Sequence, residues 1–210
     1  MFLDEDSILY LTDSYKVSHW RQLPPGLTNT FAYFECRGGA WPASLLFGIQ
    51  PNLNWHFGGP RVTEKGVLEA EKFYASHFNN PHIFNTEGWM RIAKHHNGML
   101  PLRIRAVPEG TLVPNHNILM SLESTDEKLP WITGWVESLM MHTWYGTTVC
   151  SLSFHAKQII MRHLLRTGTP ELIDYKLHDF GFRGASSVQT ARIGGAAHLV
   201  NFRGTDTIPG

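Results

Sequence analysis

Cysteine is scarce in this chain of 210 residues, which contains only Cys36 and Cys150. The two lie far apart, and neither belongs to a CxxC or Cys/His spacing that would bind zinc. Isolated cysteines are typical of proteins from a reducing compartment. We therefore expect a cytoplasmic protein, and we predict no protein-held metal.

An excess of charge of either sign is also lacking, because Lys plus Arg and Asp plus Glu number 18 each. Without a basic field, binding to nucleic acid by counterion release is not expected. No apolar run reaches the ~18 residues of a membrane span. The chain begins MFLDED (residues 1–6), which is acidic where a signal peptide would be basic. We predict neither a nucleic-acid partner nor a membrane partner.

Several common catalytic motifs are absent. The sequence contains no GxxxxGK[ST], GxGxxG, HExxH or GxSxG pattern. Of the 12 histidines, His95 and His96 are adjacent, so they point to different faces of a helix. These absences argue against a P-loop enzyme, a Rossmann dehydrogenase, a zinc peptidase and a serine hydrolase.

The first 170 residues mix helical and strand patterns. With 42% hydrophobic residues, the chain can bury a sizeable core. Apolar spacing and capping residues predict helices beginning near residue 12 and over 63–78, 86–96 and 130–166, the last interrupted at Gly146. Alternating patterns predict strands over 30–37, 102–106 and 117–122.

After residue 170 the pattern changes to strand 172–179, turn 180–184, helix and a strand within 199–205. A β-α-β unit of this kind has parallel strands, whereas a complete eight-fold barrel needs about 250 residues. We therefore predict an α/β protein, with an α+β amino-terminal domain at 1–170 and the first β-α-β unit of a β/α barrel, incomplete here, at 171–210.

The chemistry concentrates in LHDFGFRG (residues 177–184) and RGTDT (203–207). Phe180, Arg183 and Asp206 fall at the carboxyl ends of the two predicted strands, where parallel α/β folds bind ligands. An aromatic face, a fixed cation and a carboxylate suit a flat, amide-bearing ring that reacts with a phosphorylated sugar. The residues indicate a nucleobase-like substrate.

Each of these residues also has a purely structural interpretation. Taken alone, Phe180 is more often a core aromatic, and Asp206 suits a turn equally well. Arg183 and Arg37 could serve only in surface ion pairs, Arg183 with Asp179. We favour phosphate recognition for both arginines, since a guanidinium matches phosphate oxygens. His178 shares the strand face of Phe180, but a core histidine is the favoured interpretation.

Six segments together resemble the nicotinamide phosphoribosyltransferase family, and they follow its order along essentially the whole chain. The segments are LTDSYKV (11–17), YFECR (33–37), FGIQ (47–50), AVPEG (106–110), YKLHDFGFRG (175–184) and AHLVNFRGTDT (197–207). The resemblance implies an enzyme that joins nicotinamide to phosphoribosyl pyrophosphate, giving nicotinamide mononucleotide and pyrophosphate for NAD salvage. It also implies Mg²⁺ with phosphoribosyl pyrophosphate, allows ATP as a further cofactor, and implies a homodimer with shared active sites.

Roles for individual residues follow from the same resemblance. Phe180 is similar to the family's ring-stacking aromatic, and Tyr15, given by the partner subunit, to the residue on the other ring face. Asp206 matches the acceptor of the nicotinamide amide hydrogens, and Arg183 the arginine shared between nicotinamide and phosphoribosyl groups. The remaining two matches are Asp13, a second acid near the pocket, and Arg37, a phosphate contact made across the dimer.

The chain also departs from the family pattern. It is far shorter, Phe182 stands where a tyrosine is common, and Pro51 stands where an aromatic usually follows GIQ. The length leaves open a truncated non-catalytic product or one half of a split enzyme. Nicotinate phosphoribosyltransferase is the alternative within the enzyme class, and Asp206 disfavours it because a carboxylate repels the carboxylate of nicotinate.

Overall fold

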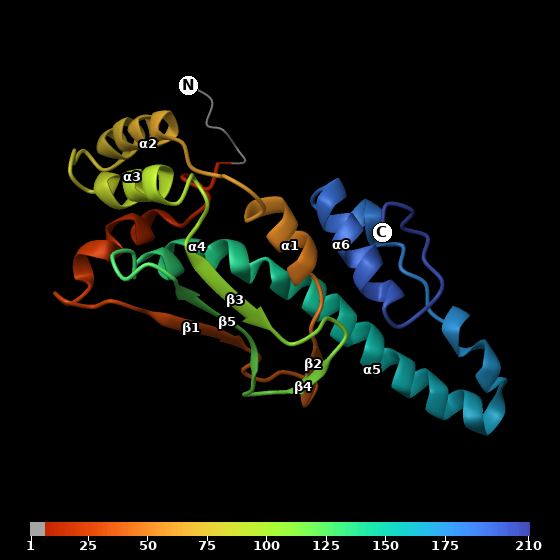
Figure 1. Cartoon of the computed structure of the whole chain (residues 1–210). Helices are drawn as coiled ribbons and strands as arrows, with labels where there is room; N and C mark the ends of the chain where they lie inside the picture. Colours follow the sequence, from red (N-terminus) through yellow and green to blue (C-terminus); the bar gives the residue numbers. More distant parts are fainter. Residues whose placement is uncertain (1–6) are drawn as a thin grey trace. The chain divides into compact units, whose positions relative to one another are not determined.

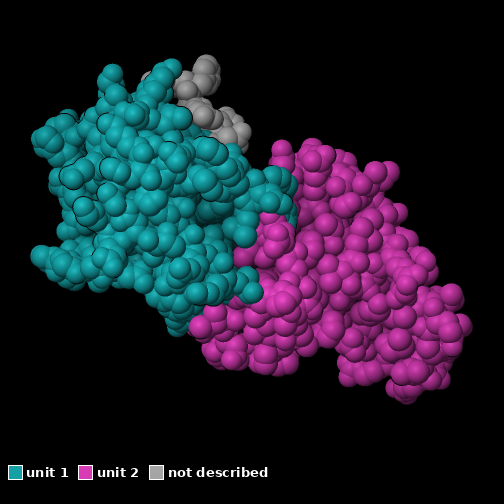
Figure 2. Space-filling view, viewed as in Figure 1, with its two compact units in different colours: residues 1–34, 51–106, 120–141 teal, residues 35–50, 107–119, 142–210 magenta. Residues whose placement is uncertain are grey.

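The computed structural model describes residues 7–210 (Figure 1). The acidic start at residues 1–6 lies outside the described part. The chain divides into two compact units, each built from three separate segments (Figure 2). Unit 1 comprises residues 1–34, 51–106 and 120–141, and unit 2 comprises residues 35–50, 107–119 and 142–210.

Helices and a small sheet make up unit 1. The sheet has the strand order β1-β5-β3, and β3 pairs with β5 antiparallel from Leu102↔Ser124 to Ala106↔Met120. The strands are β1 (Phe31–Glu35), β3 (Leu102–Ala106) and β5 (Ile118–Ser124), and the helices are η1 (Ser14–Gln22, a 3-10 helix), α2 (Glu64–His77), α3 (Thr86–His95) and α4 (Ile132–Met141). Helix α1 (Ile49–His56) begins at the end of a unit 2 segment.

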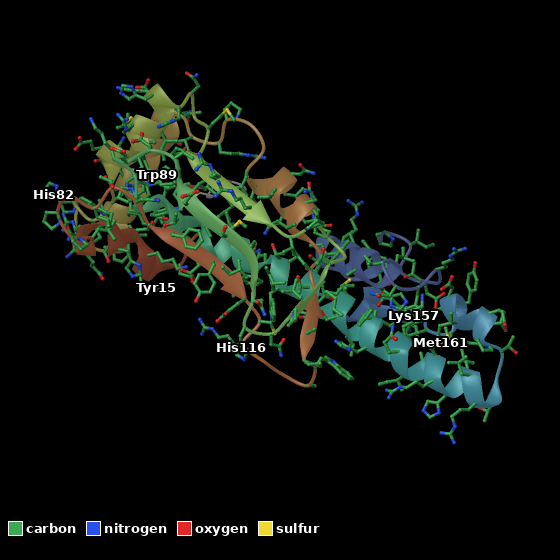
Figure 3. All side chains as sticks on the ribbon, turned by 60° about the horizontal axis from the view of Figure 1, so that its bottom comes forward. Tyr15, His82, Trp89, His116, Lys157 and Met161 are labelled. Carbon is green, nitrogen blue, oxygen red and sulfur yellow. The ribbon has the colours of Figure 1, made fainter. Side chains whose placement is uncertain are left out.

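Aromatic side chains form the core of unit 1. The Trp89 indole, labelled in Figure 3, is fully buried, with its ring centroid 5.0 Å from that of Trp135 in an edge-to-face contact. Tyr74 stacks on Phe84, and its hydroxyl donates to the carbonyl of Leu9 over 2.8 Å. This cluster joins α2, α3 and α4 in one apolar core.

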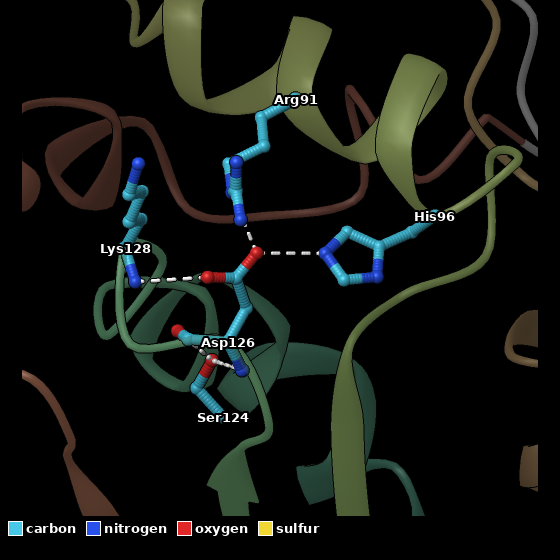
Figure 4. A network of polar contacts seen from close by, with 5 residues as sticks. All are labelled: Arg91, His96, Ser124, Asp126 and Lys128. Atoms are coloured by element: carbon cyan, nitrogen blue, oxygen red, sulfur yellow. Dashed lines mark hydrogen bonds and ion pairs between the residues drawn. The ribbon is translucent and has the colours of Figure 1, made fainter.

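A buried carboxylate ties the loop after β5 to α3 (Figure 4). Asp126 Oδ2 accepts from Arg91 Nε at 2.6 Å and lies 2.7 Å from His96 Nε2, while its Oδ1 accepts from the Lys128 N–H at 2.9 Å. Burial acts to raise the pKa of Asp126, but the hydrogen bonds from Arg91 and His96 outweigh it and hold the pKa well below its usual range. The carboxylate is therefore charged and structural.

Unit 2 is built around the long helix α5 (Thr143–Thr167). This helix packs against α6 (Val188–Leu199), against η2 (Pro170–Tyr175) and against β2 (Ala43–Leu45), which pairs antiparallel with β4 (Leu112–Pro114) (Figure 1). A final short turn of 3-10 helix, η3, spans Gly181–Gly184.

Most elements predicted for the first 170 residues are confirmed within a few positions, but the long helix breaks elsewhere. The break falls between α4 and α5 at His142, not at Gly146. Gly146 lies inside α5, where a Cβ would approach the Phe47 carbonyl oxygen to 2.9 Å and Ile193 Cγ2 to 3.0 Å. The glycine therefore permits close packing and does not interrupt the helix.

The predicted strand over 172–179 is wrong. Pro170 starts η2, a 3-10 helix, and of its residues only Ile173 is buried, so the apolar residues of this segment do not alternate into a sheet. Asp174 instead pairs with Lys157 at 2.8 Å and with Arg203 at 3.2 Å. The segment is stabilised by these side-chain contacts rather than by a sheet ladder.

The parallel β-α-β arrangement is present in reduced form. Asp179 and Thr205, on either side of α6, form one isolated parallel bridge in place of the two predicted strands. Ser187 caps α6 by accepting from the Thr190 N–H at 3.0 Å. The α/β class, with helices and strands in one chain, is confirmed, and this single bridge is the part of the predicted barrel that the chain forms.

The compact units do not follow a single cut along the chain, because unit 2 combines residues 142–210 with two earlier segments. The domain boundary near residue 170 stays a prediction. Among residues 7–210, no helix combines the length and the apolar composition needed to cross a membrane.

Candidate functional site

A cavity of about 400 Å³ in unit 2 is lined by Phe180, Phe182, Arg183 and Asp206. Three of these four residues are predicted site residues. Phe182 and Arg183 belong to η3, Phe180 immediately precedes it, and Asp206 follows α6. The structure thus brings together an aromatic pair, a cation and a carboxylate from two segments more than 20 residues apart.

The main chain of Asp179 holds the two walls of this cavity together. Its carbonyl accepts from the Asp206 N–H at 2.7 Å and from the hydroxyls of Thr205 at 3.2 Å and Thr207 at 3.4 Å. Its carboxylate Oδ1 accepts from the Gly181 N–H at 3.2 Å, at the start of η3. One residue therefore anchors both the aromatic turn and the segment that carries Asp206.

Phe180 is not a core residue. Its side chain is 65% exposed, and that of Phe182 is about half exposed. Two exposed aromatic rings beside one cavity offer faces on which a flat ring can stack, an arrangement that contributes roughly 0.5–1.5 kcal/mol beyond burial. The core interpretation of Phe180 is thereby excluded, and its substrate role stays a prediction.

Arg183 is exposed, and within residues 7–210 its side chain makes neither a hydrogen bond nor an ion pair. The surface pairing with Asp179 considered from the sequence is therefore not found in the described chain. An arginine on the wall of a cavity with its donors unused can bind the oxygens of an anion in bidentate fashion.

His178 lies beside Asp206, with Nδ1 and Oδ1 3.9 Å apart. The expectation that His178 is a core histidine is wrong, since its side chain is 42% exposed. Gly204 explains its position, because a Cβ at residue 204 would approach His178 Nε2 to 2.5 Å. A side chain at residue 204 would therefore require the imidazole to move.

Asp13 and Tyr15 lie in unit 1, so neither is among the residues that line the cavity. Tyr15, labelled in Figure 3, is 60% exposed on η1. Asp13 precedes η1 and accepts a hydrogen bond from the Ser138 hydroxyl. That bond, assisted by the charge of Lys16, holds the pKa of Asp13 below its usual range despite an opposing effect of burial.

Arg37 follows the end of β1 by two residues and is highly exposed. Its Nε lies 4.0 Å from Glu35 Oε1. Such an exposed pair is worth little. Arg37 does not line the cavity, and its proposed phosphate contact across a dimer stays a prediction.

A larger cavity of about 630 Å³ lies in unit 1, between the end of η1 and α3. Its basic residues include Lys94 and His95, and the carboxylates of Glu87 and Glu127 line the same space. None of the predicted site residues lines it. We assign the site to the smaller cavity because its lining combines aromatic rings, a carboxylate and an arginine that is unpaired within residues 7–210, although its volume is smaller.

Metal ligands do not gather in the described part of the chain: residues 7–210 contain no group of three or more His, Cys, Asp or Glu side chains able to hold a metal ion. Cys36 and Cys150 are both free thiols and both buried. Burial raises the pKa of the Cys150 thiol to about 12, so this cysteine is no nucleophile.

Comparison with known proteins shows which proteins the chain resembles. Residues 7–104 match the family described as "Nicotinamide phosphoribosyltransferase, N-terminal domain", and residues 175–210 match the "Nicotinate phosphoribosyltransferase (NAPRTase) family". A nicotinamide phosphoribosyltransferase of Xanthomonas campestris pv. campestris is 48% identical over 205 residues, 97% of this chain. The chain is thus similar to nicotinamide phosphoribosyltransferases over nearly its whole length.

Other relatives are more distant. The nicotinamide phosphoribosyltransferase of Acinetobacter baylyi is 28% identical over 211 residues, 93% of this chain. The chain spans 43% of the length of the Xanthomonas protein and 42% of the Acinetobacter protein. The crystal structure of human nicotinic acid phosphoribosyltransferase can be superposed on 94% of this chain, with a TM-score of 0.56 and 17% sequence identity. The match covers 36% of the human chain and supports the fold alone.

The sequence did not identify two residues that the structure places next to predicted site residues. Phe182 lines the cavity. Its position two residues after Phe180, in the same turn, is the sequence feature that could have identified it. Lys16 lies directly beside Asp13 and Tyr15, but a lysine in an exposed-looking segment gives no sequence signal of burial.

Proposed function

We propose that this chain supplies the nicotinamide-binding part of a nicotinamide phosphoribosyltransferase. The observation that carries the proposal is the cavity in which Phe180, Phe182, Arg183 and Asp206 meet. Its aromatic faces suit the pyridine ring, its carboxylate suits the carboxamide N–H₂, and its arginine suits a phosphate. The family supports the same assignment.

In the proposed reaction, the pyridine nitrogen of nicotinamide forms a bond to C1 of the ribose. The bond between C1 and the pyrophosphate oxygen breaks, and its electron pair leaves with the pyrophosphate. No protein nucleophile is needed. This chain contributes by aligning the ring with C1, through Phe180 and Asp206, and by stabilising phosphate charge through Arg183.

Further ligands and partners belong to the same proposal. Mg²⁺ enters as part of the substrate, bound to the diphosphate oxygens of phosphoribosyl pyrophosphate, and ATP is an additional ligand of the whole protein. A homodimer would bring Tyr15, Asp13 and Arg37 of one subunit to the cavity of the other. The two buried free thiols are compatible with the cytoplasm as the place of action.

Nicotinate phosphoribosyltransferase is the second candidate, because residues 175–210 match a family named for that activity. Asp206 favours the amide over the acid, since it accepts from a carboxamide but repels a carboxylate. The test supplies the whole protein with phosphoribosyl pyrophosphate, Mg²⁺ and either nicotinamide or nicotinate. Formation of nicotinamide mononucleotide in preference to the nicotinate product supports the proposal, and the reverse preference contradicts it.

A further inference from the structure

Lys16 is a buried cation that the proposed reaction does not use. It lies on η1, next to Tyr15, and its side chain is only 3% exposed. Burying an ammonium group is costly unless the charge is paired and hydrogen-bonded. A lysine in this position therefore requires a specific set of partners.

Those partners tie the beginning of η1 to α4. Lys16 Nζ lies 3.1 Å from Glu137 Oε2 and 3.6 Å from Asp13 Oδ2, and it donates to Ser138 Oγ at 3.2 Å. Ser138 Oγ in turn donates to Asp13 Oδ2. Lys16, Ser138 and Asp13 thus form a closed triangle of polar contacts within unit 1.

The Asp13 carboxylate is committed to this triangle instead of to the helix. Aspartate at the position before a helix normally accepts from the first backbone N–H groups. Here Asp13 occupies the N-cap of η1 but makes no side-chain capping hydrogen bond. Its carboxylate still remains about half exposed, so the side facing away from Ser138 and Lys16 is open to solvent.

Tyr15 is tied to the same cation. The Lys16 ammonium lies 5.7 Å from the centre of the Tyr15 ring, within the range of a cation–π contact, while the ring itself is largely exposed. One buried side chain therefore contacts both unit 1 residues that the family resemblance connects with nicotinamide.

We infer that Lys16 and Ser138 are positioning residues, which hold the Asp13 carboxylate and the Tyr15 ring in the orientation in which they meet the nicotinamide ring. The inference rests on the proposed function, in which Asp13 and Tyr15 contact that substrate. It differs from a purely structural role of the triangle, in which loss of Lys16 or Ser138 would lower stability and leave substrate binding unchanged.

The first test removes one hydroxyl. Ser138→Ala deletes the bond to Asp13 on a helix that tolerates alanine, and Ser138→Thr retains a hydroxyl. Ser76→Ala, on the exposed side of α2, is the matched control. In the whole protein, Ser138→Ala is expected to raise the KM for nicotinamide about 10-fold with kcat changed less than about twofold, while Ser138→Thr and Ser76→Ala stay near wild type.

The second test separates positioning from folding. Lys16→Met removes the buried charge and retains an unbranched side chain of similar length. Its two carboxylate partners, Glu137 and Asp13, are each more than half exposed and stay solvated, so the melting temperature is expected to change little while the KM for nicotinamide rises. If Lys16→Met lowers the melting temperature but leaves KM unchanged, or if Ser138→Ala leaves KM unchanged, Lys16 and Ser138 are structural only and the inference is wrong.

A third measurement is independent of turnover. The Asp13 carboxyl can be titrated by NMR in the 210-residue chain, where Ser138→Ala should move its pKa upward toward the ordinary value and Ser76→Ala should not. An unmoved Asp13 titration would contradict the inference even if the wild-type protein forms nicotinamide mononucleotide. Failure of the wild type to form that product would instead contradict the proposed function.

Discussion

Asp206 is held by its backbone, while its carboxylate remains mostly exposed beside His178. A carboxylate fixed in this way acts on a ligand through its charge and its acceptor lone pairs. Both properties distinguish an amide from an acid, because an amide donates and a carboxylate ligand is repelled. Substrate choice in the proposed reaction therefore depends strongly on this one residue.

We predict that Asp206→Asn lowers the preference for nicotinamide over nicotinate. Losing a hydrogen bond to a charged group should weaken the binding of nicotinamide by about 1.5–3 kcal/mol. Removing the charge that repels the nicotinate carboxylate should strengthen the binding of nicotinate by a comparable amount. The measurement is the ratio of kcat/KM for the two substrates in the whole protein. Glu171→Gln, an equivalent change on the exposed η2, is the control, and an equal ratio in wild type and Asp206→Asn would show that Asp206 serves only its turn.

Asp126 illustrates a carboxylate with the opposite exposure, since it is buried against Arg91 and His96. Its folded pKa is lower than the ordinary aspartate value of about 3.9, so its contribution to stability is complete above that pH and is lost as the pH falls toward the folded pKa. The free energy of unfolding should therefore decline below about pH 4.

For Asp126→Asn we expect a loss of about 3–5 kcal/mol at neutral pH, because one partner of a buried charged network is removed. The decline in acid should also become shallower. Urea unfolding at a series of pH values measures both effects. Glu69→Gln, which breaks the exposed pair with Lys65 on α2, should cost no more than about 0.5 kcal/mol, and a similar loss in both variants would contradict the role of Asp126.

At the scale of elements, replacing either of two helical glycines by alanine is expected to change the stability in opposite directions. In α5, a Cβ on Gly146 would meet the Phe47 carbonyl, which belongs to the backbone and cannot easily move aside. In α4, a Cβ on Gly134 would meet nothing within 4 Å. Since alanine is intrinsically better than glycine in a helix by about 1 kcal/mol, only the close contact differs between the two sites.

We expect Gly146→Ala to destabilise the protein by about 1–3 kcal/mol and Gly134→Ala to stabilise it by up to about 1 kcal/mol. Thermal unfolding of the two variants and the wild type measures the difference. Stabilisation by Gly146→Ala would mean that α5 is not closely packed at this position.

The same elements show what sequence patterns can and cannot predict. Helix α2 was predictable because Thr63 caps it and its apolar residues recur at helical spacing. The sequence wrongly predicts an interruption at Gly146, because the residue that requires a glycine there, Phe47, lies 99 positions away in sequence. The segment 172–179 was misjudged because its apolar residues suit a strand locally, while the long-range pairs of Asp174 determine its conformation.

At the scale of the whole molecule, part of the candidate site was predictable. Phe180, Arg183 and Asp206 do line one cavity, because the parallel bridge between Asp179 and Thr205 brings the segments on either side of α6 together. The dependence of Asp13 on Lys16 and Ser138 was not predictable, since contacts between η1 and α4 join residues more than 120 positions apart. Periodicity carries no information at that distance.

If two subunits share each active site, variants with different lesions should complement each other. In mixed dimers of Tyr15→Ala and Phe180→Ala subunits, one site carries both changes and the other carries neither, so up to about half of the wild-type activity per dimer is expected. Nicotinamide mononucleotide formation by verified mixed dimers measures this. Activity no higher than that of either parent would mean that Tyr15 and Phe180 act within the same subunit or not together.

The hydrogen bonds that converge on Asp179 have a consequence for the thermodynamics of binding. Because its carbonyl and its carboxylate fix both walls of the cavity within a single chain, the aromatic turn and the Asp206 segment are preorganised before any ligand arrives. Ligand binding then requires little ordering of the backbone, and less of the interaction energy is offset by lost conformational entropy. Affinity at this cavity should accordingly reflect the quality of its few contacts rather than the cost of assembling them.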